Sequence, residues 1–252
     1  MPEPPPDWDT EANFRRCLKG LDADSSPGWP YMRESTTIGD WLRMDPLGRP
    51  DEMQVQRLWY DVRQLMETSE CDYLHRVFVK AEPHKRAKIE EGRWRLIVAF
   101  PLHVQMLWRM CFSHQNDWLN AHPYSTPSAH GLVFCYGGWR RFVAHARTKG
   151  LRYSRDISGW DVNAPGWVMD AVRDVRKMMS GGQVSSHYAA TVDKLYRWAF
   201  HEASLIFSNG MVVQQCYAGF QKSGCFNTIS DNSIAMVLMH VAAAVRSGTT
   251  IG

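Results

Sequence analysis

The sequence predicts an α+β fold, because patterns of both helices and strands occur along its 252 residues. Apolar residues recur at helical spacing in several segments, whereas two short apolar runs, 77–79 and 96–98, are typical of strands. Apolar residues make up 44% of the chain and charged residues 22%, which excludes disorder as a description of the whole chain. A chain of this length forms one large domain or two small ones.

The helices are predicted from this periodicity, element by element. Four segments show a plausible helical pattern, at residues 51–70, 102–119, 139–148 and 194–207. The strongest pattern begins at Pro165, which suits a first helical turn, and its apolar residues continue at 3.6 spacing to Met179. The glycine pair Gly181-Gly182 then ends this helix.

The sequence favours a soluble, cytosolic protein. The longest apolar run, residues 234–245, contains His240 and is shorter than the roughly 20 apolar residues of a membrane helix. We therefore expect a core helix there, and no membrane anchor. Residues 1–6 are rich in proline and lack the order of charges and apolar residues of a signal peptide. The six cysteines show no metal-binding spacing, which favours reduced thiols in the core.

Two carboxylates follow a predicted short strand at residues 151–157. Apolar residues occupy one parity of this strand, so Asp156, on the other parity, points away from the core near the strand end. Asp161 follows in the turn before the next helix. Such a pair can bind a divalent cation with one group and meet a neighbouring ligand with the other. The alternative is a solvated loop or a helix cap, which is the more common origin of this pattern.

A polar loop and helix occur near the C-terminus. Gly219 and Gly224 bracket a loop, containing Ser223, whose backbone could adopt positive φ and approach a ligand closely. The chain then enters a helix in which Thr228 and Asn232, four residues apart, share a face. These groups can form hydrogen bonds with a sugar or a base. The alternative is a capped core helix with incidental polar residues.

The positive charge of the chain is concentrated in residues 76–95. This segment holds seven basic and three acidic residues, a net +4, whereas the whole chain carries +3. Most of these residues lie in a loop between the two predicted strands, where lysine and arginine can clamp a triphosphate or a nucleic-acid backbone. The concentration favours a local phosphate site over a generally basic surface. The alternative is a solvated charged hairpin.

These segments together resemble the RNA-dependent RNA polymerases of positive-strand RNA viruses, most closely the sobemovirus and polerovirus group. Asp156-x4-Asp161 is similar to polymerase motif A, and Ser223-Gly224-x3-Thr228-x3-Asn232 is similar to motif B. Residues 80–97 are similar to motif F, and Ser26-Pro27-Gly28-x-Pro30 is similar to motif G. The four motifs occur in the order of the family, G, F, A, B, and together span most of the chain.

The resemblance implies a right-hand polymerase fold with fingers and an incomplete palm. The implied divisions are an N-terminal and fingers segment with motifs G and F (1–100), a palm segment with motif A (101–180), a fingers insertion (181–218) and a palm segment with motif B (219–252).

The resemblance also implies roles for single residues. Asp156 would hold Mg²⁺, or Mn²⁺ in its place, during nucleotidyl transfer. Asp161 and Asn232 would recognise the ribose 2′-hydroxyl of the incoming nucleotide. Ser223 and Gly224 would form the flexible loop of motif B, and Thr228 would support that recognition. The residues implied in NTP binding are Lys80, Lys88, Arg93 and Arg95, and those implied in RNA binding are Ser26, Gly28, Lys85 and Arg86.

One part of the family pattern is missing from the chain. Motif C, a Gly-Asp-Asp turn, does not occur, and Gly39-Asp40 lies upstream of motif F and is followed by Trp41. The thumb is missing as well. We therefore expect no polymerase activity from this chain alone. We also expect poor solubility, because the apolar run 234–245 would normally pack beneath a complete palm sheet.

The resemblance thus favours a fragment of a viral replicase whose partners are the RNA template and product, NTPs and a second polypeptide that supplies motif C and the thumb. The alternatives are one subunit of a split polymerase, a non-catalytic RNA-binding module and a reverse transcriptase. Intact Asp156 and Asn232 disfavour the binding module, and Asn232 also disfavours the reverse transcriptase. The implied location is a viral replication complex in the host cytoplasm.

Overall fold

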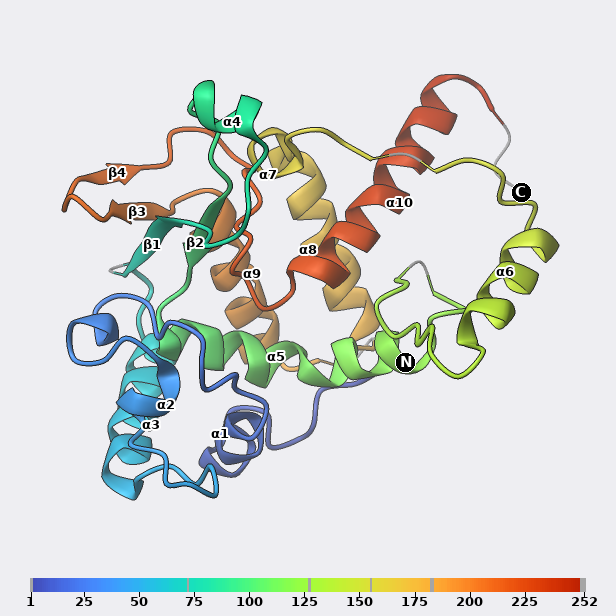
Figure 1. The fold of residues 1–252 in the computed structure, drawn as a ribbon. Coiled ribbons are helices and arrows are strands. Elements are labelled where there is room, and N and C mark those ends of the chain that lie inside the picture. Colours follow the sequence, from blue (N-terminus) through green and yellow to red (C-terminus); the bar gives the residue numbers. More distant parts are fainter. Residues whose placement is uncertain (1, 72, 127, 155, 182–183, 250–252) are drawn as a thin grey trace.

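Ten α-helices and one small sheet form the part of the chain that the structure describes, and the sheet lies at one edge of the molecule (Figure 1). The structure is a computed structural model, and it describes residues 2–71, 73–126, 128–154, 156–181 and 184–249. The helices are α1 (Glu11–Leu18), the 3₁₀ turn η1 (Tyr31–Arg33), α2 (Ile38–Trp41), α3 (Glu52–Glu67), α4 (Arg86–Glu90), α5 (Leu102–Ala121), α6 (Gly138–Thr148), α7 (Trp160–Asn163), α8 (Gly166–Met179), α9 (Ser186–Phe200) and α10 (Thr228–Arg246). The strands are β1 (Leu74–Val79), β2 (Leu96–Ala99), β3 (Ser204–Phe207) and β4 (Val212–Gln214). Helices and a mixed sheet together confirm the predicted α+β class.

The four strands form a single sheet in the order β2-β1-β3-β4. Strands β1 and β2 are antiparallel, with Val77 opposite Val98, so the two predicted strands are confirmed as a hairpin that presents the basic loop. Strand β3 runs parallel to β1. The helix predicted over 194–207 is therefore wrong beyond Phe200, where α9 ends. The free edge of β1 offers backbone hydrogen bonds to the apolar run that follows, and these override its helical pattern.

The other helix predictions are confirmed, with small shifts at their ends. Helix α3 begins after Asp51, whose side chain accepts a hydrogen bond from the backbone N–H of Gln54 at 3.2 Å. Helix α8 follows Pro165 as its N-cap residue, and Gly181 just beyond its end has φ +85°. The second glycine of the predicted stop, Gly182, lies outside the described residues.

The strand predicted over 151–157 is wrong. Residues 151–154 and 156–157 form no strand, and Arg155 lies outside the described residues. A strand requires a neighbour for its backbone groups, and none of the described strands lies beside this segment. Leu151 is 63% exposed, Tyr153 is 93% exposed and Ile157 is half-buried, so the alternation of apolar and polar residues fully buries neither face.

Helix α5 joins the two halves of the core. Its residues Val104, Trp108 and Phe112 pack with residues of α8 and α9 in one cluster. Leu102, Met106 and Met110, on its other side, pack with α1, α2 and α3 in a second cluster. Figure 1 shows α5 crossing the centre of the molecule between these two groups of helices. The site elements are therefore held from below by one continuous helix.

Helix α10 corrects the expectation of a short core helix. It extends over Thr228–Arg246 and is long and apolar enough to cross a membrane, a test that core helices of soluble proteins also pass. Its buried residues lie in the first two turns (Ser230, Asp231, Ile234 and Ala235). Beyond them, Val237, Val241 and Val245 are exposed. An apolar face of this helix is thus uncovered by any described residue.

Candidate active site

The motif A carboxylates lie on a loop and a short helix. Asp156 is exposed in the irregular segment, and Asp161 is half-buried in the first turn of α7. Helix α7 begins after Gly159, whose φ of +63° allows the sharp change in chain direction. Buried Ala164 then leads the chain into α8. The local chain thus presents one carboxylate in water and fastens the other to the body of the protein.

Backbone hydrogen bonds join motif A to the loop that precedes motif B. The N–H of Gln221 donates to the carbonyl of Asp161 at 2.7 Å, and the N–H of Phe220 donates to the carbonyl of Ala164 at 3.0 Å. Gly219 has φ +111°, and a Cβ there would lie 2.1 Å from the carbonyl oxygen of Ala164. Only glycine fits this position. The two segments, whose bonded residues are 56 and 60 positions apart in the chain, therefore form one rigid unit.

The same loop packs against strand β2. The hydroxyl of Ser223 donates to the carbonyl of Leu96 at 3.3 Å, and Gly224 forms a parallel bridge with Ala99. A Cβ at Gly224 would lie 2.4 Å from the carbonyl oxygen of Val98. Gly219 has the expected positive φ, whereas Gly224 does not. Glycine is required at position 224 because a side chain would collide with strand β2. The motif B loop thus contacts the end of the motif F hairpin.

The two polar residues of the motif B helix differ in their contacts. Thr228 donates from its hydroxyl to the carbonyl of Cys225 at 2.7 Å, which closes the turn before α10. The side-chain oxygen of Asn232 accepts a hydrogen bond from the indole N–H of Trp160 at 2.8 Å. Trp160 is the direct neighbour of Asp161, so this bond holds Asn232 beside motif A. These contacts bring together the residues that the sequence suggested for ribose recognition.

The basic residues of motif F are mostly paired with glutamates. Glu82 contacts both Lys80, at 2.7 Å, and Arg95, at 3.1 Å. The hydrogen bond from Lys80, more than the one from Arg95, lowers the pKa of Glu82. The remaining pairs are Arg93 with Glu91 and Arg86 with Glu90. Lys85, which precedes α4, and Lys88 form no ion pair with a described residue. An arriving triphosphate would therefore compete with carboxylates for these cations.

Motif G is packed onto the end of the same hairpin. Gly28 has φ +69°, and a Cβ there would lie 2.5 Å from the carbonyl oxygen of Phe100. The hydroxyl oxygen of Ser26 accepts hydrogen bonds from the N–H of Gly28 at 3.3 Å and from Arg76 at 3.5 Å. Motifs G, F, A and B thus meet around strand β2 and the loop before α10.

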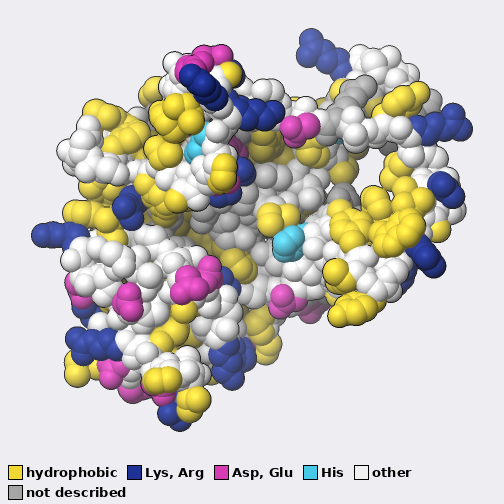
Figure 2. All heavy atoms as spheres, in the orientation of Figure 1, with side chains coloured by type: hydrophobic (Ala, Val, Ile, Leu, Met, Phe, Trp, Pro, Cys, Tyr) yellow, Lys and Arg dark blue, Asp and Glu magenta, His cyan; other side chains and the backbone are white. Residues whose placement is uncertain are grey.

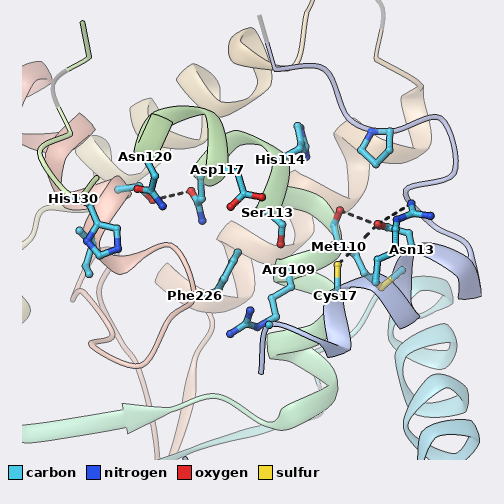
Figure 3. Close-up of a pocket in the computed structure, with 16 residues that line it drawn as sticks. Asn13, Cys17, Arg109, Met110, Ser113, His114, Asp117, Asn120, His130 and Phe226 are labelled. Atoms are coloured by element: carbon cyan, nitrogen blue, oxygen red, sulfur yellow. Dashed lines mark hydrogen bonds between the residues drawn. The ribbon is translucent and has the colours of Figure 1, made fainter. Parts of the chain in front are cut away.

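A polar pocket of about 500 Å³ lies between α1, α5 and the start of α10 (Figure 3). The guanidinium of Arg109 lies 4.6 Å from the ring centroid of Phe226, next to the motif B loop, and forms no ion pair with a described residue. Burial lowers the pKa of His114 in the same pocket to about 4, so its imidazole is neutral at pH 7. A cation of this kind beside an aromatic ring can bind a phosphate. The sequence prediction did not include Arg109.

A buried ion pair supports motif B from below. Arg176 of α8 donates to one carboxylate oxygen of Asp231 of α10 at 2.7 Å, and both side chains are fully buried. The hydroxyl of Tyr196, from α9, donates to the other oxygen at 2.8 Å. Arg176 also donates to Ser230 at 2.6 Å and to Gln115 of α5 at 3.2 Å. Four helices thus meet at one network, next to Asn232.

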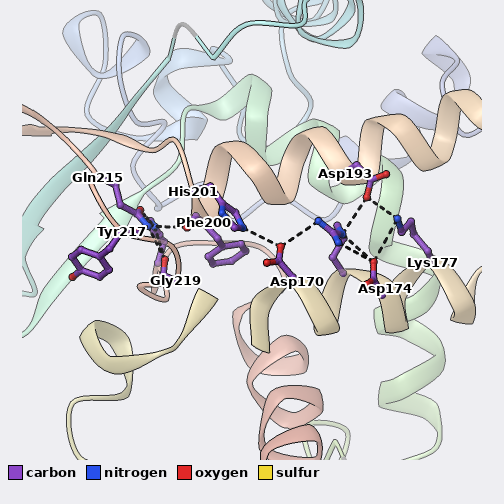
Figure 4. A network of polar contacts seen from close by, with 11 residues as sticks. Asp170, Asp174, Lys177, Asp193, Phe200, His201, Gln215, Tyr217 and Gly219 are labelled. Atoms are coloured by element: carbon purple, nitrogen blue, oxygen red, sulfur yellow. Dashed lines mark hydrogen bonds and ion pairs between the residues drawn. The ribbon is translucent and has the colours of Figure 1, made fainter. Parts of the chain in front are cut away.

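A second polar network lies on the surface between α8 and α9 (Figure 4). Asp170 accepts hydrogen bonds from His201 at 3.0 Å and from Arg173 at 3.2 Å. In the same view, the amide of Gln215 donates to the carbonyls of Phe200 at 2.8 Å and Gly219 at 3.0 Å. Gln215 therefore holds the start of the motif B loop against the end of α9.

Lys222, also missed by the sequence prediction, is fully buried within the motif B loop. Its ammonium group contacts the side-chain oxygen of Gln215 and the carbonyl of Gly219, and it lies 4.7 Å from the ring centroid of Phe220. No described carboxylate pairs with it. Burial lowers the pKa of Lys222 from 10.5 to about 7. Lysine is seldom buried, so the sequence carried no signal for this position.

We expect the stability of the chain to depend on pH through Lys222. Below pH 7 this lysine is protonated in both the folded and the unfolded chain. Above about pH 7 only the unfolded chain keeps the proton, up to about 10.5, so the contribution of Lys222 to stability rises with pH. The unfolding free energy of the wild type minus that of Lys222→Met should rise by about 1.4 kcal/mol per pH unit between pH 7 and 8.5.

Urea unfolding of both proteins at several pH values measures this difference, and taking the difference cancels the titration of other groups. Exposed Lys149 provides the control, because Lys149→Met should leave the slope unchanged. A constant difference between wild type and Lys222→Met would contradict the burial of an unpaired amine.

Among the described residues, no group of three or more histidine, cysteine, aspartate or glutamate side chains could hold a metal ion. Mg²⁺ in proteins is commonly held by one or two carboxylates together with substrate phosphates and water. Asp156, which is exposed and lies five positions before Asp161, fits one part of such a set. The donor groups present are therefore consistent with a shared Mg²⁺ site and not with a site built by this segment alone.

Comparison with known proteins agrees with this arrangement of motifs. The family model described as viral RNA-dependent RNA polymerase matches residues 7–250. The chain belongs to this family of viral RNA-dependent RNA polymerases. The match includes the segments of all four motifs and confirms the resemblance inferred from their order.

Individual members of the polymerase family match over most of the chain. The RNA-directed RNA polymerase of Mushroom bacilliform virus is 29% identical over 92% of this chain and 58% of its own length. Replicase polyprotein P2AB of Southern cowpea mosaic virus is 33% identical over 92% of this chain and 26% of its own length. The chain therefore spans about half, or less, of the length of these relatives.

A solved structure supports the fold of this polymerase family member. The Sicinivirus 3Dpol RNA dependent RNA polymerase aligns with a TM-score of 0.67 and 21% identity, over 92% of this chain and 51% of that one. The predicted right-hand fold class is thus confirmed for the part of the hand that the chain spans.

Proposed function

We propose that this chain forms the fingers and part of the palm of an RNA-directed RNA polymerase that replicates viral RNA from NTPs. The hydrogen bonds that join motif A to motif B, from Gln221 to Asp161 and from Trp160 to Asn232, carry the proposal. They support it because they join the segment of the motif A carboxylates to the segment that would recognise the ribose, as template-directed transfer to an RNA 3′-end requires. We infer the division into segments 1–100, 101–180, 181–218 and 219–252 from the same motifs.

Each motif contributes a distinct step in this proposal. Asp156 would hold Mg²⁺, or Mn²⁺, which supplies positive charge to the transferred phosphate. Asp161 and Asn232 would form hydrogen bonds with the ribose 2′-hydroxyl, and Thr228 would keep the turn before α10 closed. Ser223 and Gly224 would form the motif B loop, which packs against strand β2.

The motif F and motif G residues would hold the charged parts of the substrates. Lys80 and Arg95 would leave Glu82 to bind the triphosphate. Each cation would then be paired with a phosphate oxygen in place of the Glu82 carboxylate. The further residues assigned to NTP are Lys88 and Arg93, and those assigned to RNA are Lys85, Arg86, Ser26 and Gly28.

A second polypeptide segment would complete the enzyme. The relatives are longer than this chain, and the exposed apolar face of α10, with Val237, Val241 and Val245, is suited to pack against such a segment. The added segment would supply motif C and the thumb. Because the relatives are viral replicases, we place the complete enzyme in a replication complex in the cytoplasm of the infected host cell.

An incorporation assay tests this function. The chain is supplied with an RNA template, a primer, Mg²⁺ and labelled NTPs, both alone and joined to a polypeptide that carries a Gly-Asp-Asp motif and a thumb. We expect label in RNA only from the joined protein. RNA binding without incorporation by the joined protein would instead support an RNA-binding module, and a preference for dNTPs over NTPs would support a reverse transcriptase.

A further inference from the structure

A second basic region lies outside all four motifs. Between Asp117 and Asp156 the sequence has no acidic residue and six basic ones, so the positive charge is not confined to residues 76–95 as expected above. The basic residues are Arg140, Arg141, Arg147, Lys149, Arg152 and Arg155. Residues 131–154, here named the α6 segment, contain five of them. Arg155 lies outside the described residues.

The α6 segment stands apart from the core. Helix α6 contains no buried residue, and Figure 1 shows it at the side of the molecule, away from the sheet. Arg140, Arg141, Arg147 and Lys149 are all exposed. In Figure 2, basic side chains are spaced along the outer rim of this lobe, and hydrophobic side chains gather on it.

The cations of the α6 segment differ from those of motif F in their partners. In motif F, glutamates pair with Lys80, Arg86, Arg93 and Arg95. No described carboxylate lies within ion-pair distance of a basic residue of the α6 segment. These cations are free to bind an external polyanion without first leaving an internal partner.

Exposed aromatic rings accompany the charges. Tyr136 is fully exposed, Tyr153 is 93% exposed and Trp139 is 53% exposed. The guanidinium of Arg140 lies 5.5 Å from the ring centroid of Trp139. Arginine and aromatic rings presented together bind single-stranded nucleic acid, because the cations contact phosphates while the bases stack on the rings.

We propose that the α6 segment is an RNA-binding surface separate from the motif F and motif G residues. This proposal rests on the proposed function, in which RNA is the template and the product. In the sequence, this segment is followed directly by the loop that carries Asp156. The absence of acidic residues favours a polyanion, and the exposed rings favour unpaired bases over a duplex backbone.

Fluorescence anisotropy tests this surface. It measures the affinity of the chain for a short labelled single-stranded RNA at a series of salt concentrations. The variant Arg140→Gln, Arg141→Gln, Arg147→Gln should bind about tenfold or more weakly. The slope of log affinity against log salt should fall by about 2, since each lost phosphate contact removes about 0.7. Trp139→Ala should weaken binding about tenfold with the salt slope unchanged.

A matched control removes the same charge elsewhere. Lys19, Arg43 and Arg63 are exposed, lie outside both basic segments and form no ion pair with a described residue. The variant Lys19→Gln, Arg43→Gln, Arg63→Gln should change the affinity less than twofold. Equal weakening by the two triple variants would overturn the proposal, because it would show a response to net charge alone.

Two further results separate the alternatives. Vesicles of phosphatidylcholine and phosphatidylserine serve as a second polyanion. If the α6 variant lost vesicle binding and kept RNA affinity, the segment would be a membrane surface and the RNA proposal would be wrong. Failure of nucleotidyl transfer would refute the proposed function only, because the anisotropy of bound RNA requires no catalysis.

Discussion

Alanine at Asp156 should abolish nucleotidyl transfer by the completed polymerase while leaving RNA binding intact. A metal ion contributes several kcal/mol to stabilisation of the transition state, and each 1.36 kcal/mol corresponds to a factor of ten in rate. Loss of its carboxylate ligand should therefore lower incorporation by about a thousandfold or more. Because Asp156 is exposed and forms no hydrogen bond with a described residue, the substitution should not unfold the chain.

The assay compares incorporation and RNA affinity for wild type, Asp156→Ala and a control. Asp24 is an exposed aspartate outside the four motifs, so Asp24→Ala should retain wild-type incorporation. Parallel loss of RNA affinity in Asp156→Ala would point to a binding role for this residue. Incorporation above a tenth of the wild-type rate would exclude Asp156 as a metal ligand.

Removal of the Asp231 carboxylate should produce the largest loss of stability. Asp231→Ala leaves the guanidinium of Arg176 buried without its charge partner and the hydroxyl of Tyr196 without its acceptor. Breaking a buried ion pair on one side costs about 3–5 kcal/mol of unfolding free energy. The expected loss is comparable to half the stability of an ordinary domain, so this variant should be partly unfolded at 37 °C.

Urea unfolding measures this loss, and two further variants identify its cause. Replacement of both charges by apolar residues, Arg176→Met with Asp231→Leu, should restore most of the stability, because no uncompensated charge remains. The exposed pair Arg86–Glu90 serves as the comparison, and Glu90→Ala should cost about 0.5 kcal/mol or less. If the double variant were as unstable as Asp231→Ala, packing and not the unpaired charge would explain the loss.

The ion pair also explains how a helix with few buried residues keeps its orientation. Only the first turns of α10 are buried, and Arg176 and Tyr196 hold them through Asp231. Hydrogen bonds to both oxygens of one carboxylate are directional, so they fix the rotation of the helix about its own axis. Apolar contacts are not directional and would allow several rotations. Asn232, the next residue, is thereby directed to Trp160.

Much of the candidate site could be predicted because its signals are local. The hairpin of β1 and β2 follows from two apolar runs with a charged loop between them, and the structure confirms it. The helix after Pro165 follows from one continuous periodic pattern. The motifs are short patterns of neighbouring residues, and their order can be seen directly in the sequence. The family match agrees with them.

The errors share a different cause, which is dependence on partners distant in the sequence. Residues 151–157 have the alternation of a strand, yet no described strand pairs with them. Leu205 lies in a segment that continues a helical pattern, yet it pairs with β1 because that edge is free. A lysine such as Lys222 is expected at the surface from its residue type. Its burial depends on the rings of Phe200 and Phe220, which lie against its ammonium group.

The sequence by itself determined the class of this protein, its four motifs, their order and most of its helices, because each of these depends on neighbouring residues. The tertiary structure alone decided which motifs meet. The contact of Asp161 with Gln221, the bond from Trp160 to Asn232 and the buried pair of Arg176 and Asp231 each join segments more than 50 positions apart. Such contacts form only when the packing of the whole chain sets their distance and removes water from between them.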